Sequence, residues 1–347
     1  MKNKKVAVII YNLGGPNSLL EVKNYLFHLF YDVIILPNPF RWILSKLIAN
    51  LRAKKARGIY SNIGGKSPLL DETISQANSL QKILDKSEST QYKVFVAMQC
   101  WKPRFQDIYK DIKSFDPDKI ITIPLYPQLS SVTTGKSIEK INKIFALYKE
   151  KMKHICCYFD DVKFIDSHVK LINKTIEDNF EDDDKYRILF SAHGLPQILI
   201  DRGDPYQFQI ENMVNLLVNK INIKDLDWKI TYQSRVGKIK WLEPDTENEI
   251  KIAGAERKNL LIVPISFVSE HVETLVELDI EYKEIAESYK IKFFRVPTLQ
   301  NHEKYMESLK NIIENNIDDN KNYISSYDGK RKCPNSFKLC LCKENEI

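Results

Sequence analysis

The chain of 347 residues carries a net charge of +6, and 28% of its residues are charged against 43% that are hydrophobic. This composition is typical of a globular protein and excludes a disordered or fibrous chain. The positive charge is small and comes without a zinc finger, a paired-aromatic RNA motif or a long basic run, so nucleic-acid binding is not indicated.

Short apolar segments rich in β-branched residues alternate with helical patterns along the whole chain. Such alternation predicts parallel βαβ units and an α/β fold. No signal-peptide core precedes the first strand, and no stretch reaches the roughly 18 apolar residues that a membrane-spanning helix needs. The predicted strands are residues 6–11, 94–98, 120–124, 188–191, 230–233, 260–265 and 293–296.

Between the first two strands, residues 41–57 predict a basic amphipathic helix. The segment holds six Lys or Arg residues and no acid. Its apolar residues at helical spacing are Trp42, Leu44, Leu47, Ile48 and Leu51. From these residues alone we expect a helix that covers its domain with a basic outer face. The alternative is a helix that lies on an anionic membrane surface.

Two pairs of predicted strands resemble each other in sequence. Residues 8–16 align with residues 188–196 at an offset of 180, and residues 120–124 align with residues 260–264 at an offset of 140. Two different offsets indicate two related halves with different insertions. The alternative is a chance likeness, because short apolar strands that end in Gly or Pro are common in α/β proteins.

The two halves predict a division of the chain near residue 150. Residues 1–150 and 151–315 would form two similar Rossmann-like domains with parallel sheets, whose loop ends face a shared cleft. Residues 316–347 form a polar tail, which we expect to be a frayed appendage. The cysteines are few for this length, so we expect a reducing, cytoplasmic location. They are Cys100, Cys156, Cys157, Cys333, Cys340 and Cys342.

One histidine stands where a predicted strand runs out into a tight turn. Residues 190–196 read FSAHGLP, which places His193 just past the carboxyl end of that strand. This is the edge at which open α/β sheets bind ligands. His193 is therefore a candidate functional residue; the alternative is a structural histidine.

Three acidic residues follow the strand that ends near residue 265. Glu273, Glu277 and Glu281 are spaced by four residues, so a helix would stack their carboxylates on one face. A cation or a proton path would relieve their repulsion, and a solvated acidic face is the alternative. With His193, the first carboxylate would form a seat for a divalent metal such as Fe²⁺, or a base near neutral pH.

The motifs of common nucleotide and hydrolase sites are missing from the sequence. The turn at residues 14–15 lacks G-x-G-x-x-G, residues 63–68 (IGGKSP) lack the first glycine of a P-loop, and neither G-x-S-x-G nor H-E-x-x-H occurs. Aromatic residues gather at predicted loop boundaries, among them Tyr60, Tyr126 and Trp241. Each alone is more often a core residue, but together they would suit a large flat aromatic ligand.

Six motifs, in order, give the chain a specific resemblance to the ferrochelatase family over about residues 5–315. They are N-L-G-G-P at 12–16, Y-S-N-I-G-G-K-S-P-L at 60–69, L-Y-P-Q-L-S-S-V-T-T-G at 125–135, F-S-A-H-G-L-P at 190–196 with R-G-D-P-Y at 202–206, Y-Q-S-R-V-G at 232–237 with W-L-E-P at 241–244, and S-E-H-V-E-T-L-V-E-L-D-I-E-Y at 269–282. The resemblance implies two Rossmann-like domains around a porphyrin cleft. It also implies a lyase that inserts Fe²⁺ into protoporphyrin IX and releases two protons, the last step of haem biosynthesis.

The resemblance further implies roles for single residues. His193 and Glu273 would be the catalytic and metal-binding pair, with His193 acting as ligand, base or both, and Glu277 and Glu281 would form a path for protons or metal. The positions that would bind the porphyrin are Leu13, Arg52, Tyr60, Tyr126, Ser234 and Trp241, with Arg52 near the propionates.

The resemblance also changes the interpretation of the basic helix. Family members carry an apolar lip at the cleft mouth, which matches residues 31–57 here. It implies that a cytoplasmic protein makes peripheral contact with the inner membrane, where an upstream porphyrin oxidase would also be a possible partner.

Two features depart from the family pattern. Gln99 and Cys100 stand where many bacterial members have Arg-Tyr, so propionate binding or porphyrin preference would differ. This keeps open a chelatase for another tetrapyrrole such as coproporphyrin III, or for another metal. A non-catalytic porphyrin carrier is a further alternative, against which the intact His193 and Glu273 speak.

The second departure concerns the cysteines of the tail. Some family members hold a [2Fe-2S] cluster, which needs four thiolates. Here Cys333, Cys340 and Cys342 supply three, and Ser131 stands at the family's fourth cysteine position. We therefore expect no cluster in this chain.

Overall fold

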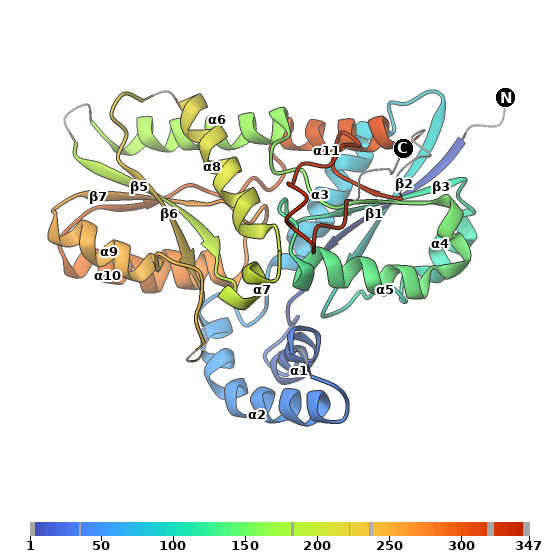
Figure 1. Cartoon of the computed structure of the whole chain (residues 1–347), viewed down its shortest axis with the longest axis horizontal. Coiled ribbons are helices and arrows are strands. Elements are labelled where there is room, and N and C mark those ends of the chain that lie inside the picture. Colours follow the sequence, from blue (N-terminus) through green and yellow to red (C-terminus); the bar gives the residue numbers. More distant parts are fainter. Residues whose placement is uncertain are drawn as a thin grey trace.

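The computed structural model describes residues 4–34, 36–181, 184–221, 223–235, 237, 239–317 and 323–342. Two β-sheets lie side by side, and every strand pair in them is parallel (Figure 1). The first sheet, in spatial order, holds β2 (Thr90–Met98), β1 (Lys4–Asn12), β3 (Lys119–Pro124), β4 (Met152–Ile155) and β9 (Ile324–Ser325). The second holds β6 (Trp228–Gln233), β5 (Tyr186–His193), β7 (Asn259–Pro264) and β8 (Phe293–Arg295). The predicted α/β class with two parallel sheets is confirmed.

Each predicted strand is present, and two short strands were not predicted. β4 reads Met-Lys-His-Ile, and its Lys153 and His154 broke the apolar run although the fold buries them. β9 has two residues, too few for any pattern. Both strands follow residue 150, yet β4 pairs with β3 and β9 pairs with β4. The first sheet therefore takes strands from both sides of the predicted division.

Helices cover both faces of each sheet. One face of the first sheet packs on α4 and α5, and one face of the second packs on α9, α10 and η3. Helices α3, α6, α8 and α11 fill the space over the remaining faces (Figure 1). The helices are α1 (Val22–Val33), α2 (Phe40–Ser61), α3 (Leu69–Leu84), α4 (Tyr109–Phe115), η1 (Ser131–Gly135), α5 (Lys136–Ile144), η2 (Ala146–Lys151), α6 (Val162–Asn179), α7 (Gln197–Asp201), α8 (Tyr206–Ile221), α9 (Thr246–Ala255), η3 (Glu273–Tyr282), α10 (Lys283–Ser288) and α11 (Glu303–Asn316).

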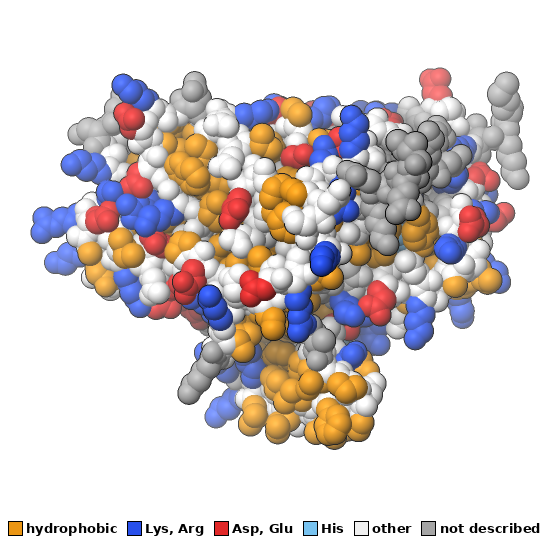
Figure 2. All heavy atoms as spheres, in the orientation of Figure 1, with side chains coloured by type: hydrophobic (Ala, Val, Ile, Leu, Met, Phe, Trp, Pro, Cys, Tyr) orange, Lys and Arg blue, Asp and Glu red, His pale blue; other side chains and the backbone are white. Residues whose placement is uncertain are grey.

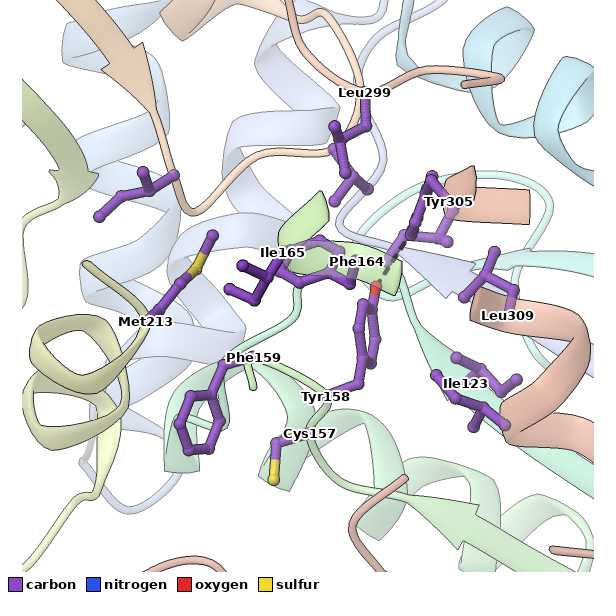
Figure 3. Packing of buried hydrophobic residues seen from close by; sticks show 14 of the residues in the cluster. Ile123, Cys157, Tyr158, Phe159, Phe164, Ile165, Met213, Leu299, Tyr305 and Leu309 are labelled. Atoms are coloured by element: carbon purple, nitrogen blue, oxygen red, sulfur yellow. Dashed lines mark hydrogen bonds between the residues drawn. The ribbon is translucent and has the colours of Figure 1, made fainter. Parts of the chain in front are cut away.

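The two sheets share one continuous hydrophobic core. Alternate side chains of a strand point to opposite faces, so Val8 of β1 and Phe190 of β5 reach the same cluster, whereas Ile9 of β1 and Leu189 of β5 face separate outer clusters. Figure 3 shows the shared cluster, in which side chains of β3, α6, α8 and α11 pack together. The two halves are therefore joined by packing as well as by the chain.

Helices α1 and α2 project as a hairpin away from both sheets (Figure 1). α2 contains the predicted helix 41–57, but most of the side chains that it buries are small, such as Ala49 and Ala53. Five of its large apolar side chains are 47% to 73% exposed and gather at the tip of the molecule (Figure 2). They are Phe40, Trp42, Ile43, Leu47 and Leu51. The expectation of a covering helix with only a basic outer face is wrong, because the exposed face is apolar as well.

No helix in the described ranges is long and apolar enough to cross a membrane.

The expectation of a frayed tail is wrong for residues 323–342. β9 extends the first sheet, and Leu339 N–H donates a hydrogen bond to the carbonyl of Gly203, with N and O 3.1 Å apart. The three cysteines of the tail are buried in the shared core. The other parts of the predicted tail, residues 318–322 and 343–347, lie outside the described residues.

Two buried histidines away from the strand-end site make folding depend on pH. Burial lowers the pKa of His154 and, with a smaller contribution from His302, the pKa of His168, each from 6.5 to about 3. His154 uses both ring nitrogens as a neutral imidazole, with Nδ1 2.7 Å from Thr122 Oγ1 and Nε2 2.9 Å from Asn142 Oδ1.

Between pH 6.5 and 3 the unfolded chain therefore binds more protons at these positions than the folded chain. The free energy of unfolding falls as the pH falls through this window, by about 1.4 kcal/mol per pH unit for each histidine. Urea unfolding at several pH values between 7 and 5 gives the change in the free energy of unfolding per pH unit. In the His154→Gln variant this change should be smaller than in the wild-type chain, by the equivalent of about one proton. An unchanged slope would contradict a neutral His154 in the folded state.

Candidate active site

His193 ends β5, Glu273 begins η3, and the two side chains meet. His193 Nδ1 lies 2.8 Å from Glu273 Oε2. The backbone at His193 is held on both sides, because its N–H donates to Ser266 Oγ at 3.0 Å and its carbonyl accepts from the Tyr206 hydroxyl at 3.0 Å. The structure thus brings together the two residues that the sequence singled out as a pair.

Each charge of the pair offsets the cost of burying the other charge. Burial by itself would lower the pKa of His193, but the Glu273 carboxylate outweighs it and the pKa is raised. Burial would likewise raise the pKa of Glu273, yet His193 and His271 hold it well below its usual range. The His193 side chain is 37% exposed and that of Glu273 is 25% exposed. Glu273 therefore stabilises the imidazolium that forms when His193 takes up a proton, at a site that stays accessible.

His271 is a site residue that the sequence analysis did not single out. It is buried, and its Nε2 lies 3.7 Å from the Glu273 Oε2 that also faces His193. Its ring packs on Phe267 with centroids 4.3 Å apart. Only its position two residues before Glu273 indicated a role for His271 in the sequence. Residues two apart do not share a helix face, so helical spacing could not connect the two side chains.

Glu277 is the anchored member of the acidic series. Its carboxylate accepts hydrogen bonds from Ser234 N–H at 2.8 Å, Gln233 Nε2 at 3.0 Å, the Tyr282 hydroxyl at 3.0 Å and the Ser234 hydroxyl. Burial, followed by the charge of Glu273, still raises its pKa. Ser234 has φ of 65°, a conformation that costs a non-glycine residue about 1 kcal/mol or more. Both polar groups of Ser234 are directed to Glu277 rather than left open for a ligand.

The acidic residues lie on a π-helix, η3, rather than on the expected α-helix. Its hydrogen bonds run from residue i to i+5, a rare geometry that is frequent at functional sites. Each turn takes slightly more than four residues, so side chains four apart stay near one face of the helix. Glu273 and Glu277 face the strand ends, whereas Glu281 is exposed. The α-helix is replaced by a π-helix, and the stacking of the three carboxylates on one face stays a prediction.

Leu13 and Tyr60 approach the pair from the N-terminal half. They pack in one cluster with Tyr25 and Val272, and Val272 directly precedes Glu273. Burial and then the Glu273 carboxylate raise the pKa of Tyr60, and the same carboxylate adds to the raised pKa of Tyr25. An apolar and aromatic surface therefore adjoins the charged pair.

Trp241 covers the turn that follows His193. Its backbone bridges to Pro196, and a Cβ at Gly194 would lie 3.5 Å from the Trp241 ring. The indole Nε1 is buried without a hydrogen-bond partner in the described part of the chain. Trp241 therefore lies close to the pair, as expected of a residue that lines this site.

Arg52 and Tyr126 have their described contacts within the N-terminal half. The Arg52 guanidinium stands 5.8 Å from the Phe30 ring on the α1–α2 hairpin. The Tyr126 hydroxyl donates to Gln99 Oε1 at 3.2 Å, and its ring packs edge-on against Tyr11 at 5.9 Å. Tyr126 is therefore held within the N-terminal half.

Gln99 and Cys100 border a cavity of about 290 Å³ beneath α1. Lys140 of α5 pairs with Asp32 and donates to the Gln99 carbonyl at 3.0 Å, while Cys100 Sγ donates to Asp32 Oδ2 at 3.2 Å. Many bacterial family members have an arginine at the position of Gln99. In this chain the Lys140 ammonium group of α5 lies beside that position instead.

Comparison with known proteins places the chain. The family model described as Ferrochelatase matches residues 5–317. The chain belongs to the ferrochelatase family. Ferrochelatases from Rickettsia felis and Rickettsia bellii (strain OSU 85-389) are 49% and 48% identical to it, over 98% and 99% of this chain and 98% and 96% of their own. A ferrochelatase from Pelagibacter ubique is 44% identical over 99% of this chain and all of its own length. The chain is therefore a metal chelatase, as the motifs predicted.

A solved structure agrees with the fold. SirB from Bacillus subtilis with Fe³⁺ superposes with a TM-score of 0.52 at 11% identity, covering 87% of this chain and 92% of SirB. At this identity the likeness bears on the fold alone, which is the two-sheet architecture described above.

The three cysteines of the tail share a core with two further cysteines of this ferrochelatase-family chain. Cys333, Cys340 and Cys342 are buried in the same core as Cys156 and Cys157, which supplies more than the four thiols that an iron–sulfur cluster needs. However, within the described ranges no group of three or more His, Cys, Asp or Glu side chains is arranged to hold a metal ion. The thiols are free and buried.

The turn after His193 leaves no room for a side chain. A Cβ at Gly194 would lie 2.7 Å from the Gln233 carbonyl oxygen, which already accepts the Gly194 N–H. Gly194→Ala should lower the free energy of unfolding by about 1–3 kcal/mol, because the turn must move away from β6. Urea unfolding measures this loss. Gly58→Ala is the matched control, since no atom lies within 4 Å of its Cβ; equal effects of the two substitutions would contradict the argument.

Proposed function

We propose that the chain inserts Fe²⁺ into protoporphyrin IX, forming protohaem and releasing two protons, as the last step of haem biosynthesis. The observation that carries the proposal is the His193–Glu273 hydrogen bond beside an apolar and aromatic surface. Membership of the ferrochelatase family supports it.

His193 is the proposed base for the pyrrole protons. With Nδ1–H donated to Glu273, the Nε2 lone pair is left free to accept a proton. The imidazolium that forms is then stabilised by a carboxylate 2.8 Å away, which also fixes the ring orientation. The raised pKa of His193 is in line with this role. A positioned base of this kind contributes about 10²- to 10⁴-fold in rate.

The substrate metal is bound by the same pair in this proposal. Imidazole nitrogen and carboxylate oxygen are suitable ligands for Fe²⁺, and two protein ligands leave positions open for the porphyrin nitrogens. When the metal binds to the facing atoms, Nδ1 and Oε2, the Nδ1 proton leaves by way of Glu277, and the ring keeps the first pyrrole proton on Nε2. As the metal passes to the macrocycle nitrogens, its bond to Nδ1 breaks and the freed Nδ1 lone pair takes up the second pyrrole proton.

Protons leave along η3. Glu277 is the next carboxylate, and its raised pKa makes it a better proton acceptor than an ordinary carboxylate. Four hydrogen bonds hold it in place while it does so. Glu281, exposed further along the same helix, passes the proton to solvent.

The macrocycle lies against the surface formed by Leu13 and Tyr60, with Trp241 on the side of the His193 turn. Bending the porphyrin so that its nitrogen lone pairs face the metal would draw about 1–5 kcal/mol from such remote contacts. We assign Arg52, on the projecting hairpin, to a propionate. Tyr126 and Ser234 act indirectly, Tyr126 through Gln99 and Ser234 through Glu277.

Anaerobic Fe²⁺ insertion into protoporphyrin IX, followed by absorbance, tests the proposal. The wild-type chain should form protohaem, and His193→Ala should slow insertion by about 10²- to 10⁴-fold while porphyrin fluorescence shows unchanged binding. His302→Ala, a histidine that precedes α11, is the control and should keep full activity.

Full insertion activity in His193→Ala would remove His193 from the mechanism. A wild-type chain that binds porphyrin but inserts no divalent metal would overturn the enzymatic proposal and support a porphyrin carrier.

The surroundings of Gln99 and Cys100 keep coproporphyrin III as a second candidate substrate. The Gln99 side chain is bonded inward to Tyr126 and Ser137, and the nearby cation is supplied by Lys140. The same assay with coproporphyrin III in parallel decides between them. Faster insertion into protoporphyrin IX supports the proposal, and a preference for coproporphyrin III replaces it.

We also propose that the tip of the α1–α2 hairpin makes peripheral contact with the inner membrane. The exposed apolar side chains of α2 alternate with basic ones, as in helices that lie on anionic membrane surfaces. Protoporphyrin is itself an apolar macrocycle, so a membrane-facing lip would shorten its path to the site.

Binding to phosphatidylglycerol vesicles tests this contact. A triple variant with Trp42→Ser, Leu47→Ser and Leu51→Ser should bind at least ~10-fold more weakly than the wild-type chain, because each buried apolar side chain contributes about 1.5–3 kcal/mol. Leu147→Ser removes an equally apolar side chain that is 90% exposed elsewhere and should not change binding. Equal binding of the triple variant and the wild-type chain would contradict membrane contact.

A further inference from the structure

The G-G-K-S-P motif has no role in the mechanism above, but it fixes the start of α3. A Cβ at Gly15 would lie 2.4 Å from Ser67, and Ser67 N–H donates to the Pro16 carbonyl at 2.8 Å. The motif therefore docks against the loop that follows β1, and α3 begins two residues after Ser67. The sequence feature that looked like part of a phosphate loop is a helix-positioning contact.

One side chain of α3 crosses to the C-terminal half. Gln76 is completely buried, and its Nε2 donates to the carbonyls of Val268 and Gln300, each at 3.1 Å. Its Oε1 accepts from the Ser269 hydroxyl at 3.0 Å. All three hydrogen bonds of this amide therefore go to residues about 200 positions away along the chain, in the segments that contain Val268 and Gln300.

The segment that Gln76 holds leads directly to the charged pair. Val268 and Ser269 precede His271 and Glu273 within the loop between β7 and η3. The Val268 carbonyl also accepts the backbone N–H of Gln300 at 2.8 Å, so Gln76 completes a three-way junction. The loop is also tied to the N-terminal half at its start, where Gln128 Nε2 donates to the Ile265 carbonyl at 3.0 Å, and Gln76 holds its middle.

We infer that Gln76 is a positioning residue, through which the N-terminal half holds the loop that carries His271 and Glu273 in its productive place. The inference rests on the proposed function. The macrocycle surface comes largely from the N-terminal half and the metal-binding pair from the C-terminal half, so their relative placement must be fixed. Displacing a reacting group by about 1 Å can cost roughly 10²-fold in rate.

Gln76→Met tests the inference, because it keeps the side-chain volume and removes the three hydrogen bonds. We expect kcat for Zn²⁺ or Fe²⁺ insertion, counted per porphyrin-binding site, to fall about 10- to 100-fold. The KM for the metal should rise, and the Kd for protoporphyrin IX, from fluorescence, should stay within about twofold. A loss of folded protein alone would change none of these three quantities.

Gln81→Met is the matched control. Gln81 is a glutamine of the same helix with as many hydrogen bonds, to Asp85, Tyr92 and Val94, all inside the N-terminal half. It should lose stability but keep kcat and the KM for the metal. Ser269→Ala, which removes only one of the three bonds, should show the same pattern as Gln76→Met at smaller size and serves if Gln76→Met does not fold.

Unchanged kcat and metal KM in Gln76→Met and Ser269→Ala, or equal changes in Gln81→Met, would overturn the inference. These outcomes leave the proposed function standing, because the wild-type chain is active in the same assay. A wild-type chain without insertion activity would instead remove the proposed function on which the inference rests.

Discussion

The structure depends on one hydrogen bond between side chains from two neighbouring strand ends. β5 and β7 pair in parallel, so the loop after β7 passes beside His193, and η3 begins with Glu273 at that point. Each member of the pair offsets the cost of burying the charge of the other. When His193 is neutral and donates Nδ1–H to Glu273, its other nitrogen is free. His271, Glu277 and the aromatic residues near the pair are all placed around this bond: His271 lies beside Glu273, Glu277 follows Glu273 along η3, and Tyr60 packs next to the pair.

The two halves supply different parts of the site. The N-terminal half contributes the apolar and aromatic surface with Leu13 and Tyr60, and the C-terminal half contributes the charged pair. A shared core and the amide of Gln76 hold the halves together. The α1–α2 hairpin is the one part of the described chain that projects away from both sheets, and its exposed apolar tip is the proposed membrane contact.

The sequence predicted the sheets well, because buried parallel strands are continuous apolar runs such as Val6 to Tyr11. It missed β4, since Lys153 and His154 broke that pattern and are buried only through tertiary contacts. His193 and Glu273 were predictable because each follows a strand end. His271 was not, because its distance from Glu273 is set by the path of a loop. The tail appeared polar, and its burial depends on contacts with α8 and the first sheet that no local pattern shows.

In the proposed mechanism the His193–Glu273 hydrogen bond drives metal insertion rather than porphyrin binding. Single-turnover insertion into enzyme-bound protoporphyrin IX, compared between the wild-type chain and Glu273→Gln, tests this most directly. We expect equal porphyrin binding and insertion slowed by roughly 10²-fold or more, because the imidazolium loses its carboxylate. Insertion at the wild-type rate in Glu273→Gln would contradict it.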